Sequence, residues 1–294
     1  MFVLMRTVAA TEEQFVNELA PLYDANEARL LCFLLLEDRL GWSKQDYLLR
    51  KQAPLNETDA DWLTHALALL KQAKPVQYLL GYAWFMGMKL LVDESVLIPR
   101  PETEELVHLV INKHRKATNK PLRIIDIGTG SGCIAISLKK RLPHATVYAL
   151  DISEEALQVA RQNAQIQSAE ISFIHADILE WDSVFPSDQL FDIVVSNPPY
   201  ITDVERREMH QNVLAHEPHL ALFVNGSAPL LFYEHIAAFA STHSHPPGDL
   251  YFEINRRYGQ DVYDLLVKKG FRQITLHQDM HGADRIIHAI ADND

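Results

Sequence analysis

Four consecutive residues, Asn197, Pro198, Pro199 and Tyr200, combine two hydrogen-bond acceptors with a rigid backbone and an aromatic ring. The side-chain oxygen of Asn197 and the backbone carbonyl of Pro198 can bind the two hydrogens of an amide or amino nitrogen. They would aim the nitrogen lone pair at an electrophile and favour the positive charge that develops on the nitrogen. The prolines fix φ and so hold the carbonyl before a substrate arrives, and Tyr200 offers an apolar face to a flat group.

These four residues predict the transfer of a methyl group to nitrogen, with neither a metal nor a covalent intermediate. We predict Asn197, Pro198 and Tyr200 as catalytic residues, and all four residues as contacts of the substrate. The alternative is a plain Pro-Pro turn after the apolar run 191–196, which predicts a buried strand.

A second candidate site is the loop Asp126-Ile127-Gly128-Thr129-Gly130-Ser131-Gly132 between a predicted strand and helix. Glycines allow a sharp turn and the close approach of a ligand, and the helix N-terminus presents unpaired N–H groups. The spacing G-x-G-x-G differs from the G-x-G-x-x-G of dinucleotide-binding proteins. S-adenosylmethionine has no pyrophosphate, and an acid such as Asp126 can help to hold its cationic amino group and sulfonium. A tight turn without a ligand is the alternative.

Two further acids end predicted strands. Asp151 closes the second strand, where a carboxylate can accept hydrogen bonds from both hydroxyls of a nucleotide ribose. Asp177 follows the third strand and would border the adenine, so that it can accept from the amino group of adenine while Ile178 packs on the ring. For Asp177 the alternative is an ordinary loop aspartate.

The elements that must position these residues alternate between strand and helix from Pro121 onwards. Apolar runs predict strands over 122–127, 146–150, 171–175, 191–196, 250–254, 273–276 and 285–289. Helices are predicted over 132–141, 153–167, 229–240 and 258–269, and residues 243–248 predict a surface loop. This alternation is typical of an α/β protein, with a parallel sheet that helices cover on both faces.

The preceding segments differ in character. Residues 1–75 predict a small helical bundle, in which Asp24 and Glu27 form a capping box before the helix 28–40 and Gly41 ends it. Glycines and aromatic residues over 76–98 predict a β-hairpin. We therefore expect a helical domain over 1–75, a hairpin linker over 76–100 and a third domain over 101–294.

Composition narrows the class of protein. With 48% hydrophobic and 22% charged residues the chain is an ordinary globular protein, and the net charge of -12 weighs against binding to bare nucleic acid. Cys32 and Cys133 predict two buried free thiols. The histidines at 210, 216 and 219 match no metal-site spacing, so no metal is expected. Without a signal-peptide core or an apolar run of about 20 residues, the protein is expected in the cytoplasm.

The order of an acidic glycine loop and Asn-Pro-Pro-Tyr resembles the class I nitrogen methyltransferases. The stretch Val96-Leu97-Ile98-Pro99-Arg100-Pro101-Glu102-Thr103-Glu104 makes the resemblance closer. With Pro75, Gln77, Tyr78, Gly81, Phe85 and Gly87 upstream, it resembles the HemK/PrmC family of peptide chain release factor N5-glutamine methyltransferases. Glu217-Pro218 with Ala221-Leu222, and Phe252-Glu253, also resemble this family.

The resemblance implies a fold: a mostly parallel, seven-stranded Rossmann-like sheet with an N-terminal helical bundle. It also implies an activity, methylation of the glutamine in the Gly-Gly-Gln motif of class I release factors, which the bundle would dock. The residues that would bind S-adenosylmethionine are Asp126, Gly128, Thr129, Gly130, Ser131, Gly132, Asp151, Asp177, Ile178 and Asn197. Asn197, Pro198, Pro199 and Tyr200 would hold the substrate glutamine.

Several points stay open in the sequence. Related enzymes methylate a ribosomal-protein glutamine or the N6 of adenine with a similar tetrapeptide. Arg100 and Glu102 could pair with each other or brace the donor pocket. Asn255 stands where the family often has glycine, and we expect it to affect a turn rather than the chemistry. We expect a monomer that binds neither a membrane nor nucleic acid directly.

Overall fold

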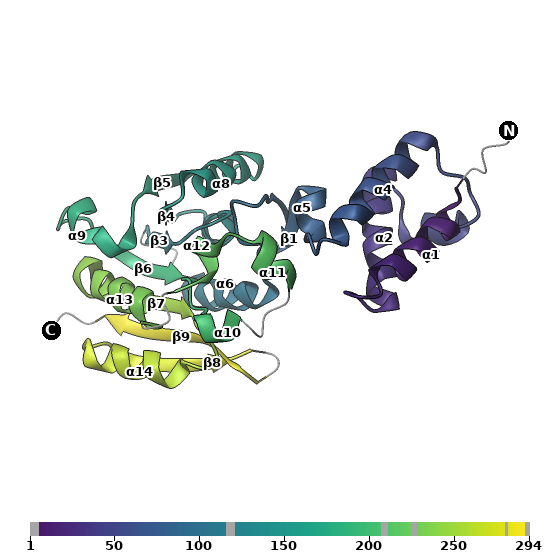
Figure 1. The fold of residues 1–294 in the computed structure, drawn as a ribbon. Coiled ribbons are helices and arrows are strands. Elements are labelled where there is room, and N and C mark those ends of the chain that lie inside the picture. The colour runs from purple at the N-terminus through teal and green to yellow at the C-terminus, as the bar shows by residue number, and fades with distance from the viewer. Residues whose placement is uncertain (1–5, 116–120, 207–210, 225–227, 280–281, 292–294) are drawn as a thin grey trace. The chain divides into compact units, whose positions relative to one another are not determined.

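The computed structural model describes residues 6–115, 121–206, 211–224, 228–279 and 282–291, which are drawn as ribbon in Figure 1. The chain forms two compact units. The smaller unit is made of Met1–Gly81 with His210–His216, and the larger unit of Tyr82–Met209 with Glu217–Asp294.

Seven strands form the single large sheet of the larger unit. They are β3 (Arg123–Ile127), β4 (Thr146–Asp151), β5 (Ile171–His175), β6 (Phe191–Ser196), β7 (Ser244–Glu253), β8 (Arg272–Gln278) and β9 (Asp284–Ala291). Their order in space is β5-β4-β3-β6-β7-β9-β8. The order reverses between β3 and β6, which is where open sheets of this kind bind ligands at the carboxyl ends of the strands. The predicted α/β class with a seven-stranded sheet is confirmed.

One sequence-based expectation about this sheet is confirmed and one is wrong. First, β9 runs antiparallel to both β7 and β8, so the sheet is mostly parallel, as expected. Second, the segment expected as a loop is the start of β7, because Ser244 pairs with Phe191 and Gly248 with Ala291. Two prolines in this segment suggested a loop, but pairing with strands on both sides outweighs that local preference.

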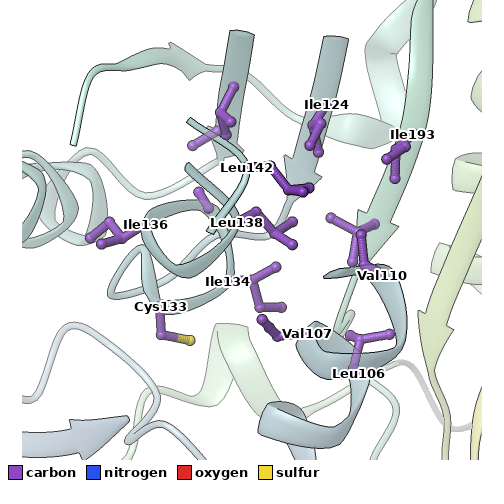
Figure 2. Packing of buried hydrophobic residues seen from close by; sticks show 14 of the residues in the cluster. Leu106, Val107, Val110, Ile124, Cys133, Ile134, Ile136, Leu138, Leu142 and Ile193 are labelled. Carbon is purple, nitrogen blue, oxygen red and sulfur yellow. The ribbon is translucent and has the colours of Figure 1, made fainter. Parts of the chain in front are cut away.

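Helices cover both faces of the sheet (Figure 1). On one face, α6 (Pro101–His114), α7 (Cys133–Arg141) and α8 (Glu154–Ile166) pack over side chains that include Ile124 and Ile193. Figure 2 shows this core. On the other face, α13 (Leu231–His243) and α14 (Gly259–Lys268) pack over Ile125 and Val194. Neighbouring residues of a strand point to opposite faces of the sheet. Because helices cover both faces, the residues on both faces are apolar.

Short elements connect these layers. They are the 3-10 helix η1 (Ile178–Glu180), α9 (Trp181–Val184), α10 (Asp203–Arg206) and α12 (His219–Leu222). The predicted hairpin is present as β1 (Tyr82–Phe85) and β2 (Met88–Leu91), but its first residues form the helix α5 (Val76–Leu80) of the smaller unit. Pro75 occupies the N-cap of α5, a place where the fixed φ of proline costs little.

The smaller unit is a helical bundle, as predicted. Its other helices are α1 (Val8–Leu19), α2 (Ala25–Leu40), α3 (Lys44–Leu49), α4 (Glu57–Leu70) and α11 (Gln211–His216). Asp24, Ser43 and Asn56 cap three of them by accepting hydrogen bonds from backbone N–H groups. Phe15, Leu35 and other apolar side chains form its separate core.

Both cysteines are free and buried, as expected. Among the described residues, no helix combines the length and the apolar character needed to cross a bilayer.

We expect Gly132→Ala to destabilise the larger unit more than Gly270→Ala. Both glycines have a left-handed backbone, which costs about 1–2 kcal/mol for alanine. Only at Gly132 would the added Cβ also meet neighbours, 3.1 Å from Ile136 Cδ1 and 3.2 Å from Ala160 Cβ. Crowding of this kind adds about 1–3 kcal/mol. Urea unfolding followed by circular dichroism measures both variants, and equal midpoints would contradict this account.

Candidate active site

A cavity of about 240 Å³ lies at the carboxyl ends of β3, β4, β5 and β6. Eight of the residues predicted from the sequence line it: Gly128, Gly130, Asp151, Asp177, Ile178, Asn197, Pro198 and Pro199. Five others do not belong to its lining: Asp126, Thr129, Ser131, Gly132 and Tyr200. The parallel strands therefore bring the glycine loop, both strand-end acids and most of the tetrapeptide to one place.

The glycine loop leaves open space at the cavity wall. Gly128 and Gly130 have φ values of +74° and +53°, and a Cβ at either position would meet no atom within 4 Å. The absence of side chains therefore keeps room against the backbone for a ligand. The N–H groups of Gly128 and Thr129 both donate to the carbonyl of Leu150, at 2.9 and 3.0 Å, which holds the loop against β4.

Asp126 is fully buried behind this loop. Its Oδ2 accepts from the Thr129 hydroxyl at 2.6 Å and from the Ala135 N–H at 3.2 Å. Its Oδ1 is buried and has no hydrogen-bond partner among the described residues. Burial raises the pKa of Asp126 from 3.8 to about 7, because the hydrogen bonds from Thr129 and Ala135 offset only part of the lost hydration. An unpaired buried acceptor next to the loop suits a cationic ligand.

Asp151 joins the loop to the next strand. Its Oδ2 accepts from the Gly130 N–H at 2.8 Å and its Oδ1 from the Ser153 N–H at 3.0 Å. Burial raises its pKa. The carboxylate therefore fixes the turn of the loop and also lines the cavity, where its remaining lone pairs can accept from hydroxyl groups.

Asp177 and Ile178 lie next along the cavity wall. Asp177 caps η1 by accepting from the Leu179 N–H at 2.8 Å, and Ile178 is 6% exposed. The local cap keeps the acid in place and presents Ile178 to the cavity. Both residues thus line the cavity, and their contacts with a base stay a prediction.

The tetrapeptide follows directly from β6, beside the end of β3. The Ser196 hydroxyl donates to the Ile127 carbonyl at 2.6 Å and ties the two strand ends together. The Asn197 Nδ2 lies 3.3 Å from the Thr103 Oγ1, to which it donates. Among the described residues, none donates a hydrogen bond to the Pro198 carbonyl. The Pro198 carbonyl, one acceptor of the predicted pair, is therefore available. The other acceptor is the Asn197 side-chain oxygen, and Thr103 holds the nitrogen of the same side chain.

Tyr200 does not belong to the lining of the cavity described above. Its hydroxyl lies 3.5 Å from the Glu253 Oε1, and its ring packs against the core of the α13 face. Burial raises the pKa of Tyr200, so the hydroxyl stays protonated. A second cavity, also of about 240 Å³, lies beside this residue and is lined by Arg256, Arg257 and Arg285 among others.

The open question about Arg100 has a clear answer. Arg100 Nη2 donates to the Glu217 Oε1 at 2.5 Å, and Glu217 is 4% exposed. The Ile98 N–H donates to the other oxygen of Glu217 at 3.2 Å. Arg100 therefore pairs with Glu217 rather than with Glu102, and the pair stands next to Pro218 in the cavity wall.

Asn255 does more than shape a turn. Its Oδ1 accepts from the Arg257 N–H at 2.9 Å, as expected of a turn residue. Its Nδ2 also donates to the Tyr200 carbonyl at 3.3 Å and to Glu205 at 2.7 Å. A glycine could not make these bonds, so Asn255 attaches the end of the tetrapeptide to the segment after β7.

Several residues of the site were not predicted. Phe232 and Ile236 on α13 supply apolar wall. Buried Asn163 on α8 donates to the Ser131 carbonyl at 2.9 Å and pairs with both backbone groups of Leu91. An asparagine inside an otherwise ordinary amphipathic helix carries no sequence signal of this role. No group of three potential metal ligands lies among the described residues, and His210 falls outside them.

Two family models match the chain. Residues 107–245 match the methyltransferase small domain, and residues 14–81 match the PrmC N-terminal domain. The fold, the cavity and the first of these matches define the chain as a methyltransferase.

Curated relatives define the family more closely. The release factor glutamine methyltransferase of Flavobacterium psychrophilum is 45% identical over 93% of this chain and 95% of the relative. That of Bacteroides thetaiotaomicron is 43% identical over 93% and 96%. The chain therefore belongs to the release factor glutamine methyltransferase family, and the predicted resemblance is confirmed.

Solved structures of more distant proteins share the fold. The hMettl16 catalytic domain in complex with MAT2A 3′UTR hairpin 6 has a TM-score of 0.55 at 16% identity, over 81% of this chain and 83% of that one. A methyltransferase from Pyrococcus furiosus has a TM-score of 0.50 at 14% identity, over 81% and 100%.

We expect Asp126→Asn to change how stability depends on pH. The unfolded chain ionises Asp126 near its ordinary pKa of 3.8, but the folded chain keeps the proton up to about pH 7. Unfolding therefore releases a proton in this range, and the free energy of unfolding falls by up to about 1.4 kcal/mol per pH unit between pH 4 and 7. The Asp126→Asn variant has no carboxyl group at this position, so its unfolding releases no such proton.

The measurement is urea unfolding of both proteins at several pH values. Stability of the variant relative to the wild type should rise from pH 4 to 7 and level off above. A difference that does not change with pH would show that Asp126 ionises normally in the folded protein.

Proposed function

We propose that the chain transfers a methyl group from S-adenosylmethionine to the side-chain amide nitrogen of the glutamine in the Gly-Gly-Gln motif of class I release factors. The observation that carries this proposal is the pair formed by Asn197 and the Pro198 carbonyl at the edge of a cavity built from the glycine loop. The shared name of relatives at 45% and 43% identity supports the choice of substrate.

We assign the cavity to the methyl donor. The bound donor would supply an electrophilic methyl carbon attached to a cationic sulfur. Gly128 and Gly130 leave space along the backbone, Asp151 can accept from ribose hydroxyls, and Asp177 with Ile178 can hold a base. Asp126 would act from behind the loop, because its unpaired Oδ1 attracts positive charge. Thr129, Ser131 and Gly132 would shape the loop rather than touch the donor.

The tetrapeptide would hold the acceptor. An amide nitrogen is a poor nucleophile because its lone pair is delocalised into the carbonyl. Binding of its two hydrogens by Asn197 Oδ1 and the Pro198 carbonyl turns the lone pair towards the methyl carbon. Both acceptors also stabilise the positive charge that would develop on the nitrogen as the N–C bond forms, the C–S bond of the donor breaks and the sulfur leaves in neutral S-adenosylhomocysteine. The methylated nitrogen would then release one hydrogen as a proton to water. Pro199 would fix the backbone, and Tyr200 would support this segment from the side of Glu253.

The helices of the smaller unit would recognise the release factor. Residues 14–81 match a domain model named for the N-terminal domain of this family, and the larger unit already contains the cavity. In this proposal, residues 1–75 form the domain that docks the release factor, residues 76–100 form the hairpin linker and residues 101–294 form the methyltransferase domain. We further propose a cytoplasmic monomer that does not bind nucleic acid directly.

The first test is transfer of a labelled methyl group from S-adenosylmethionine to a purified class I release factor. We expect label on the native factor and none on a variant with Gln→Ala in the Gly-Gly-Gln motif. Equal labelling of both would place the acceptor elsewhere in the factor. Label only on a ribosomal protein or on adenine in DNA would refute the proposed substrate.

The second test is Asn197→Ala. Removal of one of two acceptors should lower kcat by about 10²–10³-fold, as for the loss of one group that stabilises developing charge in other enzymes. Donor affinity, measured by calorimetry, should change far less. Val267→Ala, which alters an exposed side chain on α14, is the control. An unchanged kcat in the Asn197 variant would rule out the proposed chemistry.

A further inference from the structure

Thr103 links the acceptor-binding asparagine to a buried acid. It lies on α6, within the Pro-Arg-Pro-Glu-Thr-Glu segment, and is only 2% exposed. Its Oγ1 donates to the Glu253 Oε2 at 2.7 Å and accepts from the Asn197 Nδ2 at 3.3 Å. Glu253 is 1% exposed, at the end of β7. The three side chains form a chain of hydrogen bonds from the sheet to the tetrapeptide.

The chemistry of this chain of bonds decides which way the Asn197 amide faces. An ionised Glu253 has no hydrogen, so the single hydroxyl hydrogen of Thr103 must point to Glu253. The Thr103 oxygen can then only accept from Asn197, which places Nδ2 towards Thr103. The Asn197 oxygen is left on the other side, where it can accept a hydrogen from a substrate amide. In the opposite orientation, the Asn197 Nδ2 would face the substrate nitrogen, and their N–H groups would point towards each other.

We propose that Thr103 and Glu253 are positioning residues that set the orientation of the Asn197 amide, so that Oδ1 and not Nδ2 meets the substrate nitrogen. This inference rests on the proposed function, because it concerns the acceptor site of the same reaction. It gives a role to the threonine of a motif in which two other residues act elsewhere: Arg100 pairs with Glu217, and Glu104 accepts from the Met86 N–H at 2.5 Å.

The period of the strand explains how Glu253 reaches α6. Phe252 and Ile254 belong to the core on the α13 face, whereas Tyr251 belongs to the core on the α6 face. Glu253 alternates with its neighbours and so points to the α6 face, where Thr103 is the residue of α6 that donates to it. Valine at 103 would fill the same space without the hydroxyl.

The orientation also depends on the charge of Glu253. Burial raises its pKa from 4.5 to about 7. The groups around it are Thr103 and Glu102 of α6, Tyr200 after β6, Arg285 of β9, Tyr233 of α13 and Cys133 of α7. A protonated Glu253 can donate to Thr103, whose hydroxyl can then donate to Asn197 and reverse the amide. The transfer rate should therefore rise as pH increases through about 7.

The kinetic test compares Thr103→Val with Thr103→Ser at saturating donor. We expect the valine variant to lose about 10- to 100-fold in kcat, the usual effect of removing a residue that orients a site ligand. The serine variant should recover most of that loss. Ser137→Ala, which removes a buried hydroxyl bonded to the Cys133 carbonyl, is the control for a lost buried hydrogen bond. A valine variant with the kcat of the serine variant would overturn the proposal.

The pH test uses Glu253→Gln. The wild-type kcat should rise with pH through about 7, and the variant should show no such rise. Saturating donor removes the effect of Asp126 on donor binding. A variant that keeps the wild-type pH profile would exclude Glu253 from the chain of bonds.

A third measurement needs no substrate. In protein labelled with nitrogen-15 asparagine, the side-chain amide signal of Asn197 is assigned by its loss in Asn197→Ala. We expect its hydrogens to exchange slowly in the wild type and in Thr103→Ser, and to shift and exchange faster in Thr103→Val. An unchanged signal in the valine variant would refute the chain of bonds. Wild-type protein that methylates no release factor would instead refute the proposed substrate alone.

Discussion

The pairing of β3 with β6 is the constraint on which the rest of the site depends. Their parallel ladder places Ile127 beside Ser196, and the Ser196 hydroxyl donates to the Ile127 carbonyl at 2.6 Å. The first glycine of the loop, Gly128, directly follows the end of β3, and Asn197 directly follows the end of β6. Segments almost 70 residues apart in the chain are thus held side by side, because parallel strands end at the same edge of a sheet.

Four carboxyl groups surround this junction, and they have different uses. Asp126 and Asp151 hold the glycine loop through backbone and hydroxyl donors. Glu217 is paired with Arg100, whereas Glu253 contacts the tetrapeptide directly at the Tyr200 hydroxyl and, through Thr103, at Asn197. Burial raises the pKa values of Asp126 and Glu253 to about 7. The site therefore holds acids whose charge can respond to a cationic ligand and to pH near neutrality.

Asn255 and Asn197 support the tetrapeptide at its two ends. Asn255 donates to the Tyr200 carbonyl, while Asn197 donates to Thr103 at the other end. The four residues between strand and loop are thus held by side chains from α6 and from the segment after β7. Proline limits the backbone in the middle, and these bonds limit it at both ends.

The sequence by itself determined the elements and the identity of the site. Apolar runs predicted the seven strands, and helical patterns predicted the limits of several helices, since those patterns follow from local geometry. Glycine spacing and Asn-Pro-Pro-Tyr predicted a nitrogen methyltransferase, because each motif carries its chemistry within a few residues. Only the tertiary structure decided that β9 is antiparallel and that Asp126 lies behind the loop. It alone decided that Arg100 meets Glu217 and that Thr103 connects Glu253 to Asn197. The contacts of Arg100 and Thr103 join residues 94 to 150 positions apart, and no local pattern encodes which distant polar side chains share a buried site.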